Sequence, residues 1–432
     1  MAPMSLWLPY ALVLVLAVGG YVVWQSRRQR VHAEALAVAQ AAGMAEPMSL
    51  HPVVDPVRCI GSGTCAQACP EQALGVIGGK AVLVDAAACI GHGACAAACP
   101  VDAIQLVFGT ERRGVDIPQV SPQFETNVPG IFIAGELGGM GLIRKAAEQG
   151  RQAIDAIRHR PRGAWPLDVI IVGCGPAGLS AGLAAMEQGL QFRLIEQEAS
   201  LGGAVFHYPR QKVAMTAPVT LALVGKVQFT EVAKERLLAF WQDIVERTGL
   251  PIQFQERFLG ATPEGDGFVV RTNQGEFRCR SVLLALGRRG TPRKLGVPGE
   301  EQPHVVYRLT DPEQYAGQAV LVVGGGDSAV EAAVAVAEVP GTTVTLTYRG
   351  DAFARVKPRN RERLDTLRKR GRLEVLLRTE VAQINTGRVR LTTGDGSQEC
   401  AADAVIVCAG GELPMPLLRT IGVAFETKYG TA

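Results

Sequence analysis

The sequence has no pair of cysteines separated by two residues, although it contains ten cysteines in 432 residues. Because a dithiol of that spacing is a common exchange centre of disulfide oxidoreductases, its absence excludes dithiol exchange by that route. Ten cysteines are also too few for a disulfide scaffold of this length. The net charge of only +3 leaves no large positive field for nucleic acid, and 47% hydrophobic residues exclude bulk disorder. Glycine is in excess, with 50 residues, which indicates tight turns and close backbone approaches.

An uncharged apolar stretch lies near the N-terminus, over residues 6–24. It has about the length that a helix needs to cross a bilayer. Three arginines follow within residues 27–30, and no basic side chain precedes the stretch, so the positive-inside rule puts the rest of the chain in the cytoplasm. We therefore predict a single-pass transmembrane helix over residues 1–30, in the cell (inner) membrane, and a juxtamembrane spacer over residues 31–51. A buried core helix is the alternative.

Two cysteine-rich segments, CIGSGTCAQACP and CIGHGACAAACP, repeat at an interval of 30 residues. Each has the pattern C-x5-C-x3-C-P, and residues 52–108 resemble a dicluster ferredoxin domain, whose motif is C-x2-C-x2-C-x3-C-P. In each repeat the second cysteine is replaced, by Ser62 and by His92. The candidate metal ligands are Cys59, Cys65, Cys69, Cys89, Cys95 and Cys99.

The resemblance implies crossed ligation, because the last cysteine of each ferredoxin motif binds the other cluster. The two ligand sets would be Cys59, Cys65 and Cys99 for one cluster, and Cys89, Cys95 and Cys69 for the other. Three thiolates suit a 3Fe-4S cluster, or a 4Fe-4S cluster whose last iron takes Ser62, His92 or water. The alternative is a degenerate ferredoxin fold without metal, in which the thiols are buried as small hydrophobes.

A glycine fingerprint, GCGPAG, follows the apolar run DVIIV and precedes a helical segment. In this context Gly173 makes the turn, Gly175 lets a pyrophosphate approach, and Gly178 allows the helix to pack closely. Glu196, at the end of the next predicted strand, can bind ribose hydroxyls. The phosphates would lie at the helix N-terminus, beside Pro176 and Ala177.

A second fingerprint lies within AVLVVGGGDSAVEAA. Its predicted nucleotide-binding residues are Gly324, Gly326, Asp327 and Ser328. The strand after it ends at Arg349 rather than at an acidic residue, and Arg355 follows. Because an arginine at this place can bind the 2′-phosphate, the pattern favours NADP, with NAD as the alternative.

Two such units in one chain resemble the thioredoxin-reductase-like pyridine-nucleotide oxidoreductases. The resemblance implies FAD in the first unit and NADP in the second. It also places Gly203 near the flavin, and it puts Ala285-Leu286-Gly287 where the family has an Ala-Thr-Gly motif.

The family's closing motif, T-x-x-P-G-I-F-A-x-G-D, is absent from the end of the chain. It occurs instead at residues 126–136, with Gly135 followed by Glu136 where the family has aspartate. We therefore predict a circular permutation of the FAD domain, the alternative being a linker that resembles the motif by chance. The predicted segments are a permuted C-terminal piece of the FAD domain at 115–160, an FAD-binding Rossmann domain at 165–290, an NAD(P)-binding Rossmann domain at 291–400, and a return to the FAD domain at 401–432.

The predicted fold class is α/β, with two Rossmann-like domains for FAD and NAD(P). A ferredoxin-like α+β dicluster domain and one N-terminal transmembrane helix precede them. The resemblance implies a membrane-anchored flavin and iron–sulfur oxidoreductase that transfers electrons between NAD(P)H, FAD, the clusters and a redox partner, as ferredoxin–NADP reductases do. Since hydride transfer needs no side-chain acid or base, we assign no catalytic residue.

Two other functions remain open. One is a small-disulfide reductase resembling the bacillithiol-disulfide reductases, and the other is a membrane-tethered redox sensor. The expected partners are the membrane, a redox partner protein or small electron acceptor, and a second copy of the chain in a homodimer. Nucleic acid is not expected.

Overall fold

The computed structural model divides the chain into two compact units, residues 1–115 with 428–432, and residues 116–427. The residues that the structure describes are 8–41, 47, 50–89, 91, 93–111, 114–139, 141–161, 163–208, 210, 212–288, 291–353, 356–394, 396–412 and 414–430.

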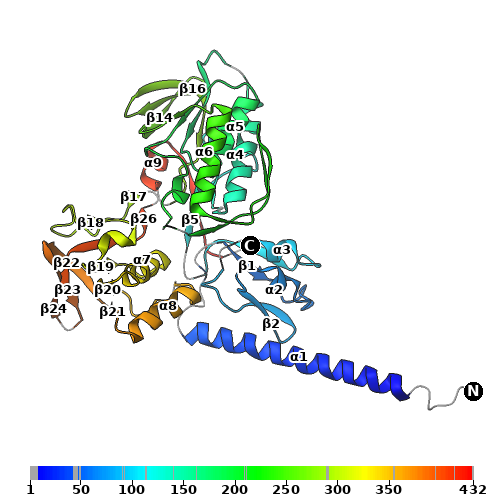
Figure 1. Ribbon diagram of the computed structural model, residues 1–432. Helices are drawn as coiled ribbons and strands as arrows, with labels where there is room; N and C mark the ends of the chain where they lie inside the picture. The colour runs from blue at the N-terminus through cyan, green and yellow to red at the C-terminus, as the bar shows by residue number, and fades with distance from the viewer. Residues whose placement is uncertain are drawn as a thin grey trace, which may run out of the picture. The chain divides into compact units, whose positions relative to one another are not determined.

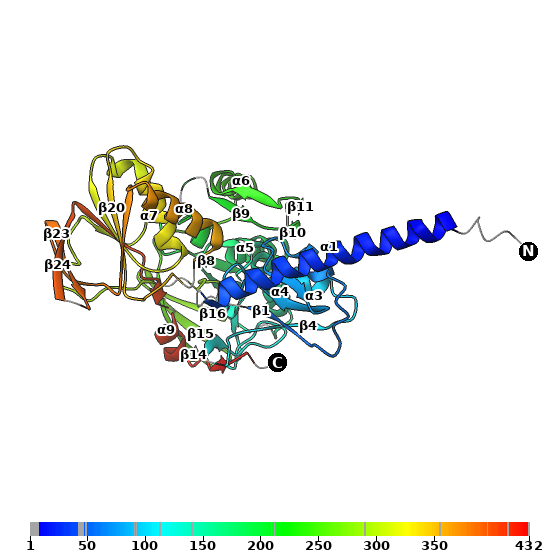
Figure 2. The same ribbon diagram turned by 90° about the horizontal axis from the view of Figure 1, so that it is seen from below.

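The first unit begins with one long helix, α1 (Leu8–Ala41), which Figure 2 shows without a break. Most side chains from Leu12 to Trp24 are exposed and apolar. Near the other end of α1, His32 Nδ1 accepts a hydrogen bond of 3.0 Å from the N–H of Val76, so this end of the helix is fixed to the cysteine-rich domain. Among the described residues no helix meets the length and apolarity that a membrane span requires. The predicted transmembrane helix covers residues 1–30, of which residues 1–7 lie outside the described ones.

The cysteine-rich domain repeats one pattern twice, a strand, a short helix and another strand (Figure 1). The outer strands pair antiparallel, and so do the inner strands. Buried cysteines and small apolar side chains form its core, because helices as short as these have little other apolar surface to bury. Its elements are β1 (His51–Val54), α2 (Thr64–Ala68), β2 (Leu74–Ile77), β3 (Lys80–Leu83), α3 (Ala94–Ala97) and β4 (Ile104–Val107).

The second unit holds two lobes, each built on its own sheet. The first sheet has the order β13-β8-β7-β16-β15-β14, and β6 also pairs with β16. Its strands are β6 (Ile131–Ile133), β7 (Leu167–Val172), β8 (Phe192–Ile195), β13 (Ile252–Gln253), β14 (Phe258–Glu264), β15 (Gly267–Thr272) and β16 (Gly275–Leu284).

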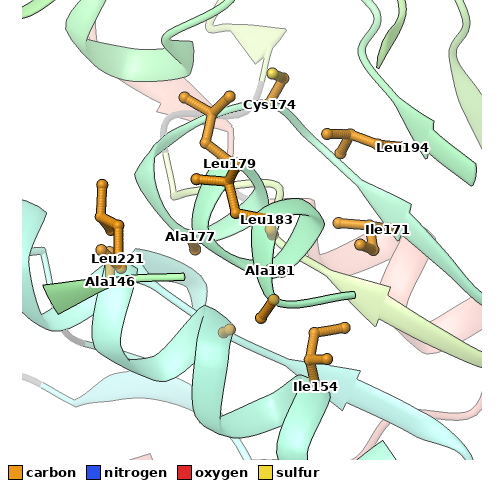
Figure 3. Packing of buried hydrophobic residues seen from close by; sticks show 14 of the residues in the cluster. Ala146, Ile154, Ile171, Cys174, Ala177, Leu179, Ala181, Leu183, Leu194 and Leu221 are labelled. Atoms are coloured by element: carbon orange, nitrogen blue, oxygen red, sulfur yellow. The ribbon is translucent and has the colours of Figure 1, made fainter. Parts of the chain in front are cut away.

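Helices cover the first sheet, and two of them differ in composition. α4 (Ile143–Arg158) is amphipathic, whereas α5 (Pro176–Glu187) consists mainly of small apolar residues and is buried on most sides. Figure 3 shows Ile154 of α4 and Ala181 of α5 among the buried side chains that join these helices. α6 (Lys234–Thr248) adds Leu237 and Trp241 to the same core.

The permuted motif predicted at residues 126–136 forms β6 and the turn after it. β6 pairs in parallel with β16, with Val282 opposite Ile131 and Leu284 opposite Ile133. The segment before the first fingerprint therefore lies in the same sheet as the strands that follow that fingerprint.

The second lobe has a parallel sheet of order β18-β25-β19-β20-β21, with α7 and α8 packed on it (Figure 2). A separate antiparallel sheet, β22-β23-β24, completes the lobe. The elements are β18 (Val305–Val306), β19 (Ala319–Val323), α7 (Asp327–Ala337), β20 (Thr343–Tyr348), α8 (Pro358–Lys369), β21 (Leu373–Leu377), β22 (Glu380–Asn385), β23 (Gly387–Thr393), β24 (Gly396–Ala402) and β25 (Ala404–Val407).

The predicted return to the FAD domain at residue 401 is too early. β25 pairs in parallel with β19, at the centre of the second sheet. A strand with the sequence Ala-Val-Ile-Val is stable only when both of its faces are buried, and the second lobe buries both. The chain rejoins the first core with Leu418, Ile421 and Val423, in and after α9 (Met415–Thr420).

Short paired strands complete the fold. These pairs are β5 (Val115–Pro118) with β27 (Phe425–Lys428), β9 (Val213–Met215) with β12 (Glu231–Ala233), β10 (Val219–Leu221) with β11 (Gly225–Val227), and β17 (Thr291–Pro292) with β26 (Gly411–Glu412).

The connection into the second lobe is held by a buried carboxylate, Glu300. It accepts hydrogen bonds from the N–H groups of Leu295 and Gly296, and from the hydroxyl of Tyr307 at 2.9 Å. Burial by itself raises the pKa of Glu300, but these hydrogen bonds outweigh it and leave that pKa below its ordinary value. Burial and Glu300 together raise the pKa of Tyr307 to about 12.

Replacing Glu300 by glutamine is therefore expected to lower the free energy of unfolding at neutral pH by about 1–3 kcal/mol. Because the pKa of Glu300 is lower in the folded state than in the unfolded state, its contribution is present above the unfolded value and is lost as the pH falls through the folded value. Thermal unfolding of both proteins should show a difference at pH 7 that shrinks below about pH 4. Glu301→Gln, at an exposed neighbour, is the control and should change little. A difference that grows toward acid pH would contradict this assignment.

Candidate functional site

The first fingerprint forms the turn between β7 and the N-terminus of α5. Gly173 has a φ of 102°, which side chains rarely adopt, and a Cβ there would lie 2.6 Å from the carbonyl oxygen of Ala285. A Cβ at Gly178 would lie 1.8 Å from the carbonyl oxygen of Gly173. Pro176 and Ala177 are the first residues of α5, so the free N–H groups of this helix end lie at the turn.

A carboxylate from β8 supports this turn. Glu196 is buried, and it accepts hydrogen bonds from the N–H of Cys174 at 2.7 Å and from the N–H of Glu198 at 3.0 Å. Burial raises the pKa of Glu196, although these two hydrogen bonds oppose the shift. A carboxylate has further acceptor positions, so Glu196 can fix the turn and still bind ribose hydroxyls.

A second glycine turn closes on the fingerprint. The N–H of Gly202 donates to the carbonyl of Cys174 at 2.9 Å, and a Cβ on Gly203 would lie 3.0 Å from the Cα of Gly175. The two turns therefore approach each other at glycines, where no side chain separates their backbones. This is the geometry that a pyrophosphate or flavin requires.

The motif predicted as permuted reaches the same turn. A Cβ on Gly135 would lie 3.1 Å from the Cβ of Ala177, and a Cβ on Gly287 would lie 4.0 Å from Oε2 of Glu136. The structure therefore brings together the FAD-site residues that the sequence predicted from three separate segments.

Two residues of this region were not predicted from the sequence. The side-chain oxygen of Gln149, on α4, accepts a hydrogen bond of 2.8 Å from the N–H of Gly135. Burial lowers the pKa of Arg288, while the charges of Glu136 and Asp116 raise it. The sequence offered one signal for Arg288, namely its place directly after Gly287. Only the folded chain shows that Glu136 lies near Arg288.

The second fingerprint repeats this geometry in the other lobe. Gly324 has a φ of 148°, and a Cβ there would lie 2.4 Å from the carbonyl oxygen of Cys408. A Cβ on Gly326 would meet no atom within 4 Å, so the face above the N-terminus of α7 is open. Ser328 lies in the first turn of α7. Asp327 points to α8, where its carboxylate accepts hydrogen bonds from the N–H of Lys357 at 2.8 Å and from Asn360 at 2.9 Å.

The predicted 2′-phosphate residues lie after β20. Arg349 is exposed, and no ion pair is formed by it among the residues that the structure describes. Tyr348 packs its ring against the turn, since a Cβ on Gly325 would lie 2.2 Å from that ring. Arg355 lies outside the described residues.

The charge interactions among the cysteines of the first unit follow the two predicted ligand sets in part, because Cys65 of one set also acts on Cys95 of the other. Burial raises the pKa of Cys65, and Cys59 and Cys99 raise it further; burial also raises the pKa of Cys89, and Cys69 adds to that shift. Burial raises the pKa of Cys95 to about 11. Thiols this close and this shielded from water fit a site that binds them as thiolates to iron.

A cavity and two hydrogen bonds support the fit to iron–sulfur clusters. Cys69, Cys89 and Cys95 line one cavity together. The sulfur of Cys59 accepts the N–H of Ala81 at 3.4 Å, and that of Cys99 accepts the N–H of Ala103 at 3.2 Å, as cluster-bound sulfurs do. No three potential ligands in the described part of the chain converge on a single metal ion. Cluster ligands surround several irons, so they stand farther apart.

Ser62 and His92 stand at the two substituted second positions. The hydroxyl of Ser62 lies 3.1 Å from that of Thr64, and both are near the surface. His92 lies outside the described residues.

The other four cysteines lie outside the cysteine-rich domain, and two of them, Cys174 and Cys408, lie beside the two dinucleotide turns. Burial raises the pKa of Cys174, and it raises the pKa of Cys279 and of Cys408 to about 12. Burial also raises the pKa of Cys400. Since the thiolate is the nucleophile in exchange, these thiols are poorly suited to dithiol chemistry.

This site defines a flavoprotein with two dinucleotide-binding lobes and a separate iron–sulfur domain. A family model for pyridine nucleotide-disulphide oxidoreductases matches residues 170–431, and a model for a 4Fe-4S dicluster domain matches residues 51–100. The chain belongs to the pyridine nucleotide-disulphide oxidoreductase family. It is an FAD-dependent pyridine-nucleotide oxidoreductase that carries iron–sulfur clusters.

Named relatives agree with this assignment. A ferredoxin–NADP reductase of Ignicoccus hospitalis is 32% identical over 266 residues, which are 60% of this chain and 77% of that protein. A ferredoxin–NADP reductase of Streptococcus pyogenes is 35% identical over 191 residues, which are 43% of this chain and 55% of that protein. The chain thus spans little more than half the length of the streptococcal relative.

Solved structures show the same fold. The bacillithiol disulfide reductase of Staphylococcus aureus has a TM-score of 0.52 and 24% identity, over 59% of this chain and 79% of that one. The corresponding enzyme of Bacillus cereus has a TM-score of 0.53 and 24% identity, over 59% and 81%. At this identity the likeness concerns the fold alone.

Proposed function

We propose that this chain transfers electrons between NADPH and a protein redox partner of ferredoxin type. The observation that carries the proposal is the cysteine cavity of the first unit, which occurs in a chain with two dinucleotide turns and no exchange dithiol. The names of the relatives, ferredoxin–NADP reductases, support it. Bound FAD supplies the conversion between two-electron and one-electron transfer, and iron–sulfur clusters take one electron at a time.

Each part of the proposed site has a defined task. Gly173, Gly175 and Gly178 let the FAD pyrophosphate reach the N-terminus of α5, and Glu196 binds the adenosine ribose. Glu136 lies beside Gly287 and binds the ribityl chain with a longer side chain than the aspartate of the family. Gly326 leaves room for the NADP pyrophosphate at α7.

We also infer that residues 115–160 are the permuted end of the FAD lobe. The family match begins only at residue 170, yet β6 pairs with β16 and α4 packs on α5. The permutation would leave the iron–sulfur domain directly before the segment that holds Glu136.

Anaerobic titration of the purified full chain with NADPH tests the proposed function. We expect the flavin absorbance to bleach, and the reduced protein to pass electrons to an added ferredoxin faster than to oxygen. A flavin that stays oxidised with excess NADPH would contradict the proposal. Turnover with bacillithiol disulfide instead of ferredoxin would favour the small-disulfide reductase. Reduction without turnover on any acceptor would favour a redox sensor.

Membrane attachment is a separate part of the proposal. The uncharged run of residues 6–24, with arginines behind it and exposed apolar side chains on α1, supports one N-terminal span with the soluble domains in the cytoplasm. We expect the full chain to sediment with membranes and to resist extraction by salt, and a chain without residues 1–30 to stay in the supernatant. Equal partition of both chains would contradict the anchor.

A further inference from the structure

The two cysteine repeats pack against two strands at matching places. β3 lies against the first repeat, because a Cβ on Gly61 would collide with the carbonyl oxygen of Gly79. β1 lies against the second repeat, because a Cβ on Gly91 would lie 2.6 Å from the carbonyl oxygen of Leu50. Gly61 and Gly91 are the third residues of their repeats, so Gly79 and Leu50 occupy equivalent positions.

The registers of the two strand pairs agree with this match. β3 pairs with β2 from Lys80, which lies opposite Ile77, and β1 pairs with β4 from His51, which lies opposite Val107. The two partners are 30 residues apart, which is the interval of the cysteine repeats. The residue after Lys80 is therefore matched by the residue after His51, which is Pro52.

In the first repeat, β3 donates two hydrogen bonds to a cluster ligand. The N–H of Ala81 donates to the sulfur of Cys59 at 3.4 Å, and Lys80 Nζ donates to the carbonyl oxygen of Cys59 at 2.7 Å. The ammonium group is thus held at the ligand, although Lys80 lies at the surface. Reduction gives a cluster one more negative charge, so a nearby cation and an N–H group that points at a sulfur both favour the reduced form.

In the second repeat, the matching residue of β1 cannot donate. Proline has no N–H group, so Pro52 gives no hydrogen bond of this kind to Cys89. Pro52 is buried and lines the cavity of the second group of cysteines together with Cys89 and Cys95. A strand keeps its pairing with a proline only where that N–H faces away from the partner strand, and the bond from Ala81 to Cys59 shows that this position does so.

We propose that β1 and β3 give the two clusters different reduction potentials. The N–H of Ala81 and the ammonium group of Lys80 raise the potential of the first cluster, and Pro52 withholds the matching hydrogen bond from the second. In a chain that has received one electron, these contacts favour the electron on the first cluster. Its transfer from the second cluster oxidises one and reduces the other by one electron, with no proton moved and no bond broken. This inference rests on the iron–sulfur domain and not on the identity of the redox partner.

The test measures the reduction potentials of both clusters in the full chain, by EPR at controlled potentials after anaerobic reconstitution with iron and sulfide. Lys80→Met is expected to lower one potential, and Pro52→Ala, which restores an N–H group, is expected to raise the other. Each should change the equilibrium of the electron between the two clusters about tenfold, which is about 59 mV for one electron. Because every variant is compared with the unchanged chain, the fourth ligand of each cluster is the same in each comparison.

Conservative and control variants separate this effect from a change of fold. Lys80→Arg keeps the positive charge and should keep the potential, and Pro52→Val also supplies an N–H group and should act as Pro52→Ala does. Arg30→Gln, at an exposed arginine of α1, and Pro56→Ala, at an exposed proline, should leave the affected potentials unchanged. Iron and acid-labile sulfide per chain, with circular dichroism, show whether each variant keeps its clusters and its fold.

Three results would overturn the proposal. In the first, Lys80→Met or the Pro52 variants leave both potentials unchanged or move them in the opposite direction. In the second, the Lys80 and Pro52 variants act on the same cluster. In the third, the unchanged chain assembles only one cluster. Bleaching of the flavin by NADPH in the same variants reports on the proposed function separately.

Discussion

Replacing Gly150 by alanine is expected to strip FAD from the protein, although the change lies 23 residues before the first fingerprint glycine. A Cβ at this point on α4 would lie 2.0 Å from the carbonyl oxygen of Ala177 and 2.9 Å from its carbonyl carbon. Both are backbone atoms of the first turn of α5, so relief of the clash must move the helix end at which the pyrophosphate binds.

Two effects of this substitution oppose each other. Alanine has a helix propensity about 1 kcal/mol better than glycine, which by itself would stabilise α4. Overpacking at a fixed backbone costs about 1–3 kcal/mol and occasionally more, so the clash is expected to win. The measurements are FAD per chain after purification, from the absorbance spectrum, and the midpoint of thermal unfolding.

Gly260→Ala is the matched control, because a Cβ there would meet no atom within 4 Å. It should keep its flavin. If Gly150→Ala also keeps its flavin and melts at a higher temperature, then α4 does not pack on α5 in this way, and residues 115–160 do not complete the FAD lobe.

The second large effect concerns the choice between NADPH and NADH. Arg349→Ala is expected to raise the KM for NADPH about 10- to 100-fold, which corresponds to the loss of a charged hydrogen bond of about 1.5–3 kcal/mol. The KM for NADH should stay the same, since NADH has no 2′-phosphate for the guanidinium to bind. Steady-state reduction of a one-electron acceptor with each nucleotide measures both values.

Arg359→Ala supplies the control for this prediction. Arg359 is exposed in the first turn of α8 and lies in the same basic stretch. If it changes the KM for NADPH as much as Arg349→Ala does, the stretch acts as a general positive surface. If Arg349→Ala weakens both nucleotides equally, Arg349 supports the turn after β20 and does not bind the 2′-phosphate.

The chemistry of the enzyme is concentrated in local patterns, and the sequence was sufficient to find them. The two glycine fingerprints, the spacing of Cys59, Cys65 and Cys69, and the absence of an exchange dithiol each depend on a few neighbouring residues. Such patterns can be found in sequence because a turn at a helix N-terminus needs particular φ angles, and a cluster needs thiolates at fixed intervals. The cofactors and the family follow from these patterns.

Contacts between distant segments could not be found in this way. The run Ala404–Val407 has the pattern of a buried strand in either lobe, and only its pairing with β19 decided where it belongs. Gly150 is one of 50 glycines, and nothing near it in the sequence indicates that it faces Ala177.

Pro52 also illustrates the difference between local sequence patterns and contacts between distant segments. It precedes the first cysteine repeat in the sequence, where a proline ordinarily marks a turn or an edge strand. Folding crosses the two cysteine repeats and brings Cys89 and Cys95 to the cavity that Pro52 lines. The sequence alone determined which cofactors this protein is built for. The tertiary structure decided which further side chains meet them, because pairing and packing place residues together that the chain keeps far apart.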